Sequence, residues 1–175
     1  MSRVIGEESS QAIASEALMS LQLQFELDQL NQAYGDALDS GRLSEWASMF
    51  MPDGRYRAQG RENFDRDLPL AAMFCDGSAM FLDRVLVIEK VMVFAPRQIR
   101  HVISPMRLVS REGSAIVARS SFCVFHTLPH QPTELLSVGR YEDRVERDAD
   151  GVLRFRERSA IYDTLLIPNS LVYPL

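Results

Sequence analysis

Cysteine and histidine are the side chains with which this sequence could hold iron. An iron–sulfur centre with mixed ligands takes two Cys and two His, with one Cys–His pair on each of two loops. Cys123 and His126 are spaced as C-x-x-H, but Cys75 is followed by Asp76 and Gly77 and has no matching His. Cys123 also lies within a run of residues typical of a strand. The sequence therefore predicts that this chain holds no iron–sulfur cluster.

A single iron ion would favour two His and one carboxylate, with open coordination positions. His126 and His130 are four residues apart, which suits two ligands on one face of a helix. Pro129 and Pro132 disfavour a helix at this point. We therefore expect two histidines in a loop near a strand end, and no metal site.

Acid–base catalysis in a pocket would need a side chain whose pKa is tuned by burial. The candidates are Tyr34, Asp53, Tyr56, His101 and Asp163. Asp53 lies in a predicted turn and Asp163 near the end of a predicted strand, so neither need face a pocket. A purely structural role is the competing interpretation for all five. Glycine-rich phosphate loops and nucleophile elbows have no match in the sequence.

Composition limits the partners and the compartment. The chain has 175 residues, a net charge of −5 and a pI of about 5.2. An acidic protein of this kind lacks the basic field that nucleic-acid binding requires. Two cysteines are too few for a disulfide framework, and the densest apolar stretch, residues 85–95, is too short to span a bilayer. With no secretory signal visible, we expect a reduced, cytoplasmic protein without membrane contact.

The pattern of elements predicts one α+β domain over residues 16–175, preceded by a flexible or partner-docked arm over residues 1–15. Apolar residues recur at helical spacing from about Ser15 to Leu38, and Gly41 suits the end of that helix. Further helices are expected from Ser44 and over residues 83–93, and a short strand over 55–59. Four β-rich segments follow: 98–109, 115–127, 135–146 and 152–163. Helices followed by long strands predict N-terminal helices on one face of a curved antiparallel or mixed sheet, which makes a cone.

Two features of the C-terminal part suggest an interface. Arg154, Arg156 and Arg158 alternate with Leu153 and Phe155, so a regular strand would place the three arginines on one face. Like charges at alternate positions repel one another unless they are paired. A mainly apolar tail follows, and it is poorly hidden in a monomer. We hypothesise that neighbouring subunits contact the arginines and the tail residues Leu165, Leu166, Ile167, Leu171, Val172 and Tyr173. A solvated outer face for the arginines, and packing of the tail on the chain's own core, are the alternatives.

Three stretches in order resemble the β subunits of Rieske-type aromatic-ring-hydroxylating dioxygenases, over roughly Phe25 to Leu175. The first runs from Asp39 to Tyr56 and includes Leu43, Trp46, Phe50 and Asp53. The second is the run from Arg97 to Ser104, which contains Arg100-His101. The third runs from Arg156-Glu157-Arg158 through Asp163 to Pro174-Leu175. The family often has Asn where Pro105 stands, so a turn or hydrogen bond there must differ.

The resemblance implies a cone fold shared with nuclear transport factor two and ketosteroid isomerase. It also implies assembly with a catalytic α subunit, as three α and three β chains. In that family the Rieske iron–sulfur cluster, the mononuclear iron and the substrate pocket belong to the α subunit, so this chain itself is expected to be non-catalytic. The implied reaction is NADH-dependent oxygen insertion into an aromatic ring, with the closest resemblance to members acting on aromatic carboxylates.

Two other functions fit the same sequence. One is a stand-alone cone enzyme, an isomerase, dehydratase or cyclase, that uses a pocket Asp or His. The other is a ligand-binding or dimerisation module without chemistry. The first predicts that the lone chain is active, and the second predicts a self-dimer with an apolar pocket.

Overall fold

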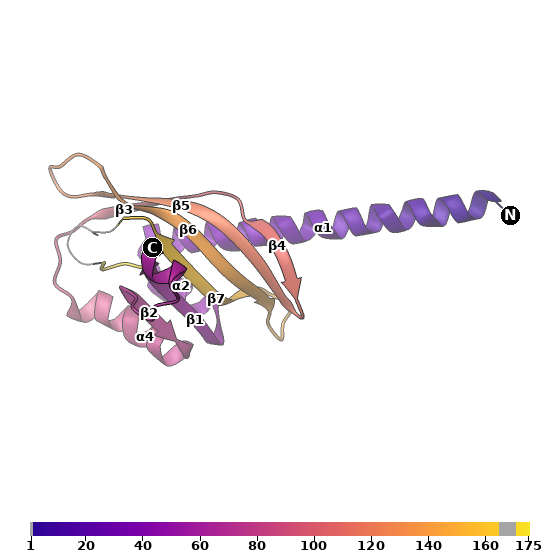
Figure 1. Ribbon diagram of the computed structural model, residues 1–175. Coiled ribbons are helices and arrows are strands. Elements are labelled where there is room, and N and C mark those ends of the chain that lie inside the picture. Colours follow the sequence, from indigo (N-terminus) through magenta and orange to yellow (C-terminus); the bar gives the residue numbers. More distant parts are fainter. Residues whose placement is uncertain (1, 165–170) are drawn as a thin grey trace.

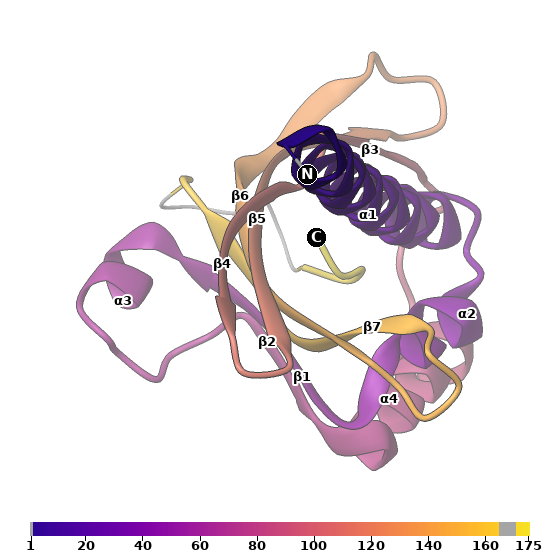
Figure 2. The same cartoon turned by 90° about the vertical axis from the view of Figure 1, so that its right-hand side faces the viewer.

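A seven-stranded mixed sheet curls around the N-terminal helix and the last residues of the chain (Figures 1 and 2). The structure, a computed structural model, describes residues 2–164 and 171–175, without the side chains of residues 2–10 and 12. Its helices are α1 (Ser2–Asp39), α2 (Leu43–Ser48), α3 (Arg61–Asp65) and α4 (Gly77–Leu86), which a π-turn at Val87–Val91 extends. Its strands are β1 (Phe50–Gly60), β2 (Met73–Asp76), β3 (Gln98–Ile103), β4 (Arg107–Glu112), β5 (Ala115–Thr127), β6 (Glu134–Arg147) and β7 (Leu153–Tyr162). The predicted α+β cone is confirmed.

The strand order is β2-β1-β7-β6-β5-β3, and β4 also pairs with β5. Strands β5, β6 and β7 form an antiparallel meander, whereas β1 runs parallel to β7. In Figure 2 the strands and α1 form a ring, with the last residues inside it. The concave side of the sheet and the inner face of α1 therefore enclose the core.

Helix α1 is longer than the sequence predicted. It begins at Ser2 rather than near Ser15, because the added stretch has no Pro and contains the helix-favouring residues Glu7, Glu8, Gln11, Ala12 and Ala14. It ends as expected: Gly41 has a φ of +68°, and its N–H donates to the carbonyl of Leu38. The part of α1 that precedes the body projects away from it (Figure 1).

Side chains of α1 take the place of a neighbouring strand along β3 and the link to β4. The amide of Gln24 donates to the carbonyl of Met106 at 2.6 Å, and the N–H of Met106 donates to Asp28 at 2.8 Å. Asn31, one turn after Asp28, donates to the carbonyl of Ser104. Asp39, three turns after Asp28, accepts from the N–H of His101. Backbone groups at a sheet edge need such partners when they are covered.

Several boundaries differ from the expectation. The predicted strand over 98–109 is divided into β3 and β4 by residues 104–106, because Pro105 has no N–H to donate to a ladder. No strand was expected between residues 60 and 81, but β2 lies there. Helix α4 begins at Gly77, before the predicted start at 83, and α2 begins at Leu43, one residue before the predicted start at Ser44. None of the helices over the described residues combines the length and hydropathy that a membrane span requires.

A β-bulge in β7 overturns the prediction that three arginines share one face. Phe155 pairs with Val145 and Glu157 pairs with Arg144, so Arg156 is an extra residue in β7. One extra residue reverses the alternation of side chains beyond it. Leu153 and Phe155 face the interior before the bulge, and Arg158 faces it afterwards. Arg158 is fully buried in its own chain, so its assignment to a subunit interface is wrong.

Gly139 marks a close approach between β6 and β7, which yields the first test. A Cβ at this position would overlap the carbonyl oxygen of Ile161 and lie 2.9 Å from the ring of Phe122. We expect Gly139→Ala to lower the free energy of unfolding by about 3 kcal/mol, the upper range for overpacking. Gly60→Ala is the control, because its Cβ would meet only ordinary contacts at 3.5 Å. Urea unfolding that gave equal midpoints for the two variants would contradict this packing.

Candidate functional site

The interior of the cone contains a buried arginine surrounded by aromatic rings. The guanidinium carbon of Arg158 lies 4.2 Å from the ring centre of Tyr34, 4.0 Å from that of Tyr141 and 4.1 Å from that of Phe155. Such distances allow cation–π attraction, which is strongest where water is excluded. The rings come from α1, β6 and β7, so one charge joins three elements.

Asp143 on β6 balances this charge. Its carboxylate accepts two hydrogen bonds from Arg158, from Nε and Nη2, each at 2.9 Å. The side chain of Asp143 is fully buried as well. A paired geometry of this kind is required because an unpaired buried charge costs several kcal/mol. The pair is therefore a fixed part of the core.

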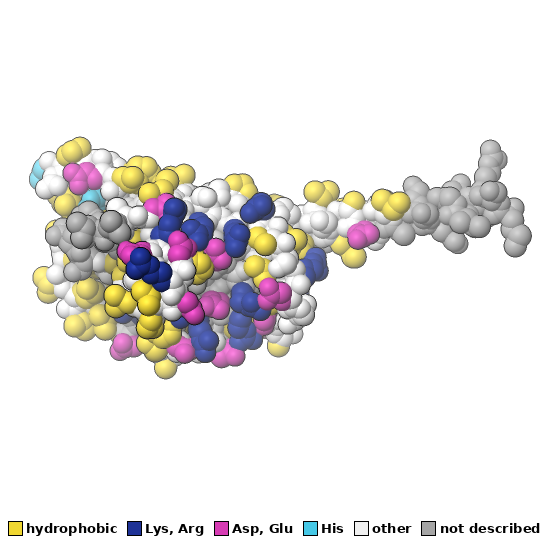
Figure 3. Space-filling view, viewed as in Figure 1, with side chains coloured by type: hydrophobic (Ala, Val, Ile, Leu, Met, Phe, Trp, Pro, Cys, Tyr) yellow, Lys and Arg dark blue, Asp and Glu magenta, His cyan; other side chains and the backbone are white. Residues whose placement is uncertain are grey.

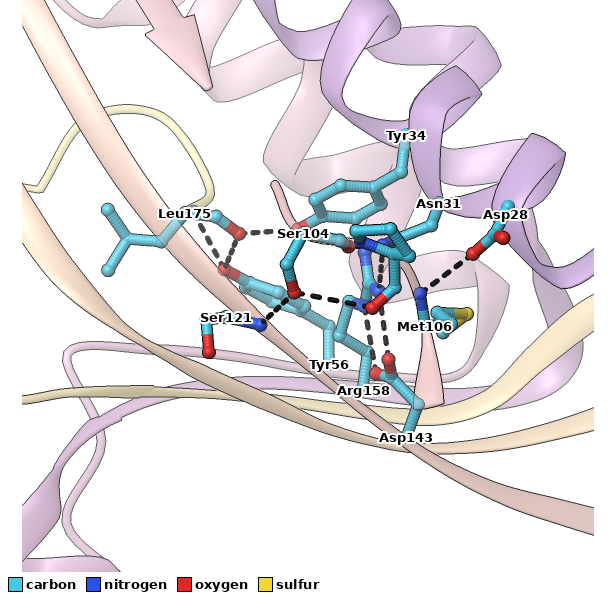
Figure 4. A network of polar contacts seen from close by, with 11 residues as sticks. Asp28, Asn31, Tyr34, Tyr56, Ser104, Met106, Ser121, Asp143, Arg158 and Leu175 are labelled. Atoms are coloured by element: carbon cyan, nitrogen blue, oxygen red, sulfur yellow. Dashed lines mark hydrogen bonds and ion pairs between the residues drawn. The ribbon is translucent and has the colours of Figure 1, made fainter. Parts of the chain in front are cut away.

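Asn31 connects the ion pair to the edge of the sheet (Figure 4). Its Oδ1 accepts from Nη2 of Arg158 at 2.7 Å, while its Nδ2 donates to the carbonyl of Ser104. The hydroxyl of Ser104 in turn accepts from the N–H of Ser121 on β5. Helix α1, the turn between β3 and β4, and strands β5, β6 and β7 thus share one polar network.

Leu175 lies in the same interior and occupies its centre. The hydroxyl of Tyr34 donates to the main-chain oxygen of Leu175 at 2.6 Å, and the hydroxyl of Tyr56 donates to it at 3.2 Å. The N–H of Leu175 donates to the hydroxyl of Tyr56 at 2.9 Å. Leu175 and Val172 are buried. The space that a substrate would need is therefore filled by the chain itself.

Burial controls the protonation of the interior tyrosines. It raises the pKa of Tyr34 to about 12, against a partial lowering by the charge of Arg158. It also raises the pKa values of Tyr56 and Tyr141 well above their usual value. Burial raises the pKa of Asp143 too, and Arg158 opposes that shift. The three phenols are therefore neutral at physiological pH and do not act as bases, and Tyr34 and Tyr56 act as hydrogen-bond donors.

His101 is buried next to α1 and is paired with a carboxylate. Its Nδ1 lies 2.7 Å from Oδ1 of Asp39, and its side chain is fully enclosed. The same carboxylate accepts from the N–H of His101 and pairs with Arg100. Nε2 of His101 has no hydrogen-bond partner among the described residues. The pair has the composition of an acid–base dyad, but it also joins the end of α1 to β3.

The remaining candidates lie outside the interior. Asp53 is 75% exposed and pairs with Arg156, and Asp163 pairs with Arg61 at 2.6 Å at the outer rim. Of the five predicted residues, Tyr34 and Tyr56 lie together in the interior, His101 is paired separately with Asp39, and Asp53 and Asp163 lie outside the interior. The interface prediction for Arg154 and Arg156 stays a prediction, although both are paired within the chain.

Only some of the tail residues predicted to form an interface lie within the described residues. Leu165, Leu166 and Ile167 lie outside the described residues. Val172 is buried, and Leu171 and Tyr173 pack against the core of their own chain. For these three residues the alternative, packing on the chain's own core, describes the structure, because the interior polar groups draw the tail inward through Leu175.

The sequence reasoning missed Asn31, Tyr141, Asp143, Arg158 and Leu175. A usable signal existed for Asp143, which shares the inward-facing row of β6 with Tyr141 and Val145. A lone carboxylate in a buried row requires a cationic partner. No comparable signal marked Arg158, since the bulge that turns it inward depends on strand pairing.

The described residues do not fit an iron site. Cys123 and His126 point to opposite faces of β5, so the C-x-x-H spacing cannot bring them to one metal. Cys75 is buried in β2, at the other end of the sheet from β5. Over the residues that the structure describes, no three His, Cys, Asp or Glu side chains gather as metal ligands would.

The ion pair supplies a second test. Asp143→Ala would leave a buried guanidinium unpaired, and we expect a loss of about 3–5 kcal/mol in the free energy of unfolding. The double variant Asp143→Leu/Arg158→Met removes both charges and should lose clearly less than Asp143→Ala alone. Glu45→Ala, at an exposed ion pair with Arg42, is the control and should lose nothing measurable. Urea unfolding that showed the double variant to be the least stable would contradict a coupled pair.

The raised pKa values of the tyrosines supply a third test. In the folded state they lie above the unfolded value of 10.0, so the folded chain binds more protons at high pH. The contribution of these tyrosines to stability should be fully present below about pH 10 and should be lost as the pH rises through the folded values. Tyr141→Phe should make this fall shallower, whereas Tyr162→Phe, at a half-buried tyrosine, should change it less. Phenolate absorbance follows the titration of the tyrosines, and unfolding midpoints follow the loss of stability. A loss of stability above about pH 10 that was identical in the unchanged chain, Tyr141→Phe and Tyr162→Phe would contradict the raised pKa values.

The SnoaL-like domain family matches residues 19–159 of this chain. A solved structure from Novosphingobium aromaticivorans, named as the beta subunit of an aromatic-ring-hydroxylating dioxygenase, is 35% identical with a TM-score of 0.79. The match covers 89% of this chain and 97% of that one. ActVI-ORFA from Streptomyces coelicolor has a TM-score of 0.65 at 21% identity over 81% of this chain and 98% of that one, which shows a shared fold alone.

Two curated relatives agree with this match. The small subunit of anthranilate 1,2-dioxygenase from Burkholderia cepacia is 30% identical over 151 residues, which are 86% of this chain and 93% of the relative. Subunit beta 2 of the terminal oxygenase component of terephthalate 1,2-dioxygenase from Comamonas is 26% identical over 83% of this chain and 94% of the relative. With its SnoaL-like cone and these relatives, the chain belongs to the small (β) subunit family of the aromatic-ring-hydroxylating dioxygenases.

Proposed function

We propose that this chain is the structural β subunit of a multicomponent aromatic-ring-hydroxylating oxygenase, and that catalysis takes place in the larger α subunit. The observation that carries this proposal is the filled interior of the cone. Arg158, its three rings and Leu175 leave a substrate no place at the position where a cone enzyme would bind one. The mismatch between the described residues and an iron site supports the same division of labour.

The partner chain would supply what this chain lacks. We propose an assembly of three α and three β subunits, with the Rieske cluster and the mononuclear iron in α and electrons arriving from NADH through a reductase. The names of the relatives support an aromatic carboxylate as substrate, because anthranilate and terephthalate are both ring carboxylates. The substrate is then recognised by the α subunit.

The projecting part of α1 offers a surface for this assembly. Leu18, Leu21 and Phe25 are 67%, 69% and 63% exposed, and with Ala14 they follow a spacing of four, three and four residues. This spacing places them on one stripe of the helix, facing away from the body. Figure 3 shows hydrophobic side chains along this part of the helix. A helix that exposes such a stripe gains stability from a second chain.

The alternative, a stand-alone isomerase, dehydratase or cyclase, is favoured by one observation, the buried pair of His101 and Asp39. Leu175 argues against it, because it fills the interior and already uses the hydroxyls of Tyr34 and Tyr56. In that alternative the lone chain would turn over a ring compound without a partner.

The fourth test is co-expression with the large chain, followed by native mass measurement and an oxygenation assay. We expect a mixed hexamer in which ring oxygenation requires both chains, and a β chain that is inactive alone. Leu18→Glu/Leu21→Glu should lower the fraction of β found in the complex, because it places two charges on the apolar stripe. Ser15→Glu/Ser20→Glu adds the same charge off the stripe and should not. Turnover by the lone β chain, or no stable complex, would refute the proposed function.

A further inference from the structure

Leu175 is bound inside the cone in the manner of a ligand. Two phenol hydroxyls, from Tyr34 on α1 and Tyr56 on β1, converge on its main-chain oxygen at 2.6 and 3.2 Å. Its N–H is also bonded, to Tyr56, and its side chain is part of the aromatic and aliphatic core. These contacts recognise a hydrogen-bond acceptor carried on a branched apolar body.

The residues before Leu175 cover the approach to this place. Together with Ile99, Val124 and Leu136, which face inward from β3, β5 and β6, residues 171–174 line what remains of a narrow space. Tyr173 packs edge-on against Phe94, with ring centres 5.6 Å apart. This segment therefore lies between the concave face of the sheet and the outside.

The interior also holds polar groups that Leu175 does not use. The hydroxyl of Tyr141 and Nη1 of Arg158 are buried and have no hydrogen-bond partner among the described residues. Buried donors are normally satisfied by protein, water or a ligand. A molecule with a second polar group would find partners here that a leucine residue cannot supply.

We propose that the cone interior is a receptor for small apolar acyl compounds, in which residues 171–175 act as an intramolecular ligand. The compounds are carboxylates or carbonyl compounds on a branched aliphatic or aromatic body. Tyr34 and Tyr56 hold the acyl oxygen, and the surrounding rings hold the apolar part. This receptor is separate from ring oxygenation in the large subunit, and it admits a free compound only when Leu175 leaves the interior. The co-expression and oxygenation assay tests the proposed function and the binding assay below tests the receptor, so failure of one is distinguishable from failure of the other.

Residues 171–175 compete with any free compound for the interior, because they belong to the same chain. A segment joined by a short linker competes at an effective concentration in the millimolar range. The intact chain should therefore bind free acyl compounds only weakly. Any change that expels Leu175 should expose the full affinity of the receptor.

The fifth test uses the full-length chain with Leu175→Asp, because a carboxylate side chain is disfavoured in this apolar interior. N-acetyl-L-leucine is the probe, since it reproduces the N–H, the side chain and the acyl oxygen of Leu175. We expect isothermal titration calorimetry to show at least tenfold tighter binding to Leu175→Asp than to the unchanged chain. Val152→Asp, which adds a carboxylate at an exposed position, is the control and should behave as the unchanged chain.

Two further comparisons locate the binding. Adding Tyr34→Phe to Leu175→Asp removes one donor to the acyl oxygen and should weaken binding about fivefold. N-acetyl-D-leucine should bind at least tenfold more weakly than the L form. The proposal is overturned if a folded Leu175→Asp chain does not bind the probe. It is also overturned if the unchanged chain binds the probe equally well, or if Tyr34→Phe does not weaken binding.

The outcome remains decisive if Leu175→Asp does not fold alone. A ligand that binds only the folded state restores folding by mass action. Circular dichroism should then show refolding with about 10 mM N-acetyl-L-leucine, a concentration that occupies a site of millimolar affinity, and no refolding with the D form. Absence of refolding with the L form overturns the proposal.

Discussion

The buried ion pair between Arg158 and Asp143 is the interaction on which the rest of the structure depends. A guanidinium removed from water needs a carboxylate, further hydrogen bonds and a polarisable surrounding. Here these come from β6, from Asn31 on α1 and from the rings of Tyr34, Tyr141 and Phe155. Satisfying one charge thus fixes the position of the helix against the sheet. Because Asn31 also bonds to Ser104, the same charge determines where α1 meets the sheet edge.

The pair also explains why the cone of this chain acts as a core and not as an active site. In a cone enzyme the concave face must leave room for a substrate and a free acid or base. Here burial keeps Tyr34 and Tyr56 neutral and their hydroxyls donate to Leu175, while the arginine is enclosed by rings. A rigid, filled cone suits a subunit that supports the catalysis of another chain. Its exposed apolar stripe on α1 then lies where a partner can reach it.

The α+β cone, the end of α1 at Gly41 and the strands β5, β6 and β7 could be predicted from the sequence, because turn residues and apolar spacing are local signals. The interior could be predicted only in part. Tyr34 and Tyr56 were among five candidate pocket residues, but Arg158 was predicted to contact a neighbouring subunit, since the bulge at Arg156 that turns it inward depends on pairing with β6. The inward course of Leu175 likewise depends on groups 119 and 141 residues away along the chain. Whether Arg154 and Arg156 contact another subunit depends on a chain that this sequence does not contain.

Whether the interior is a filled core can be seen in a crystal structure of the chain assembled with its large subunit. We expect density for Arg158 between its three rings and for an acyl oxygen, that of Leu175 or of a bound compound, between Tyr34 and Tyr56. A water-filled cavity at that position, with Arg158 turned away from Asp143, would contradict a filled core.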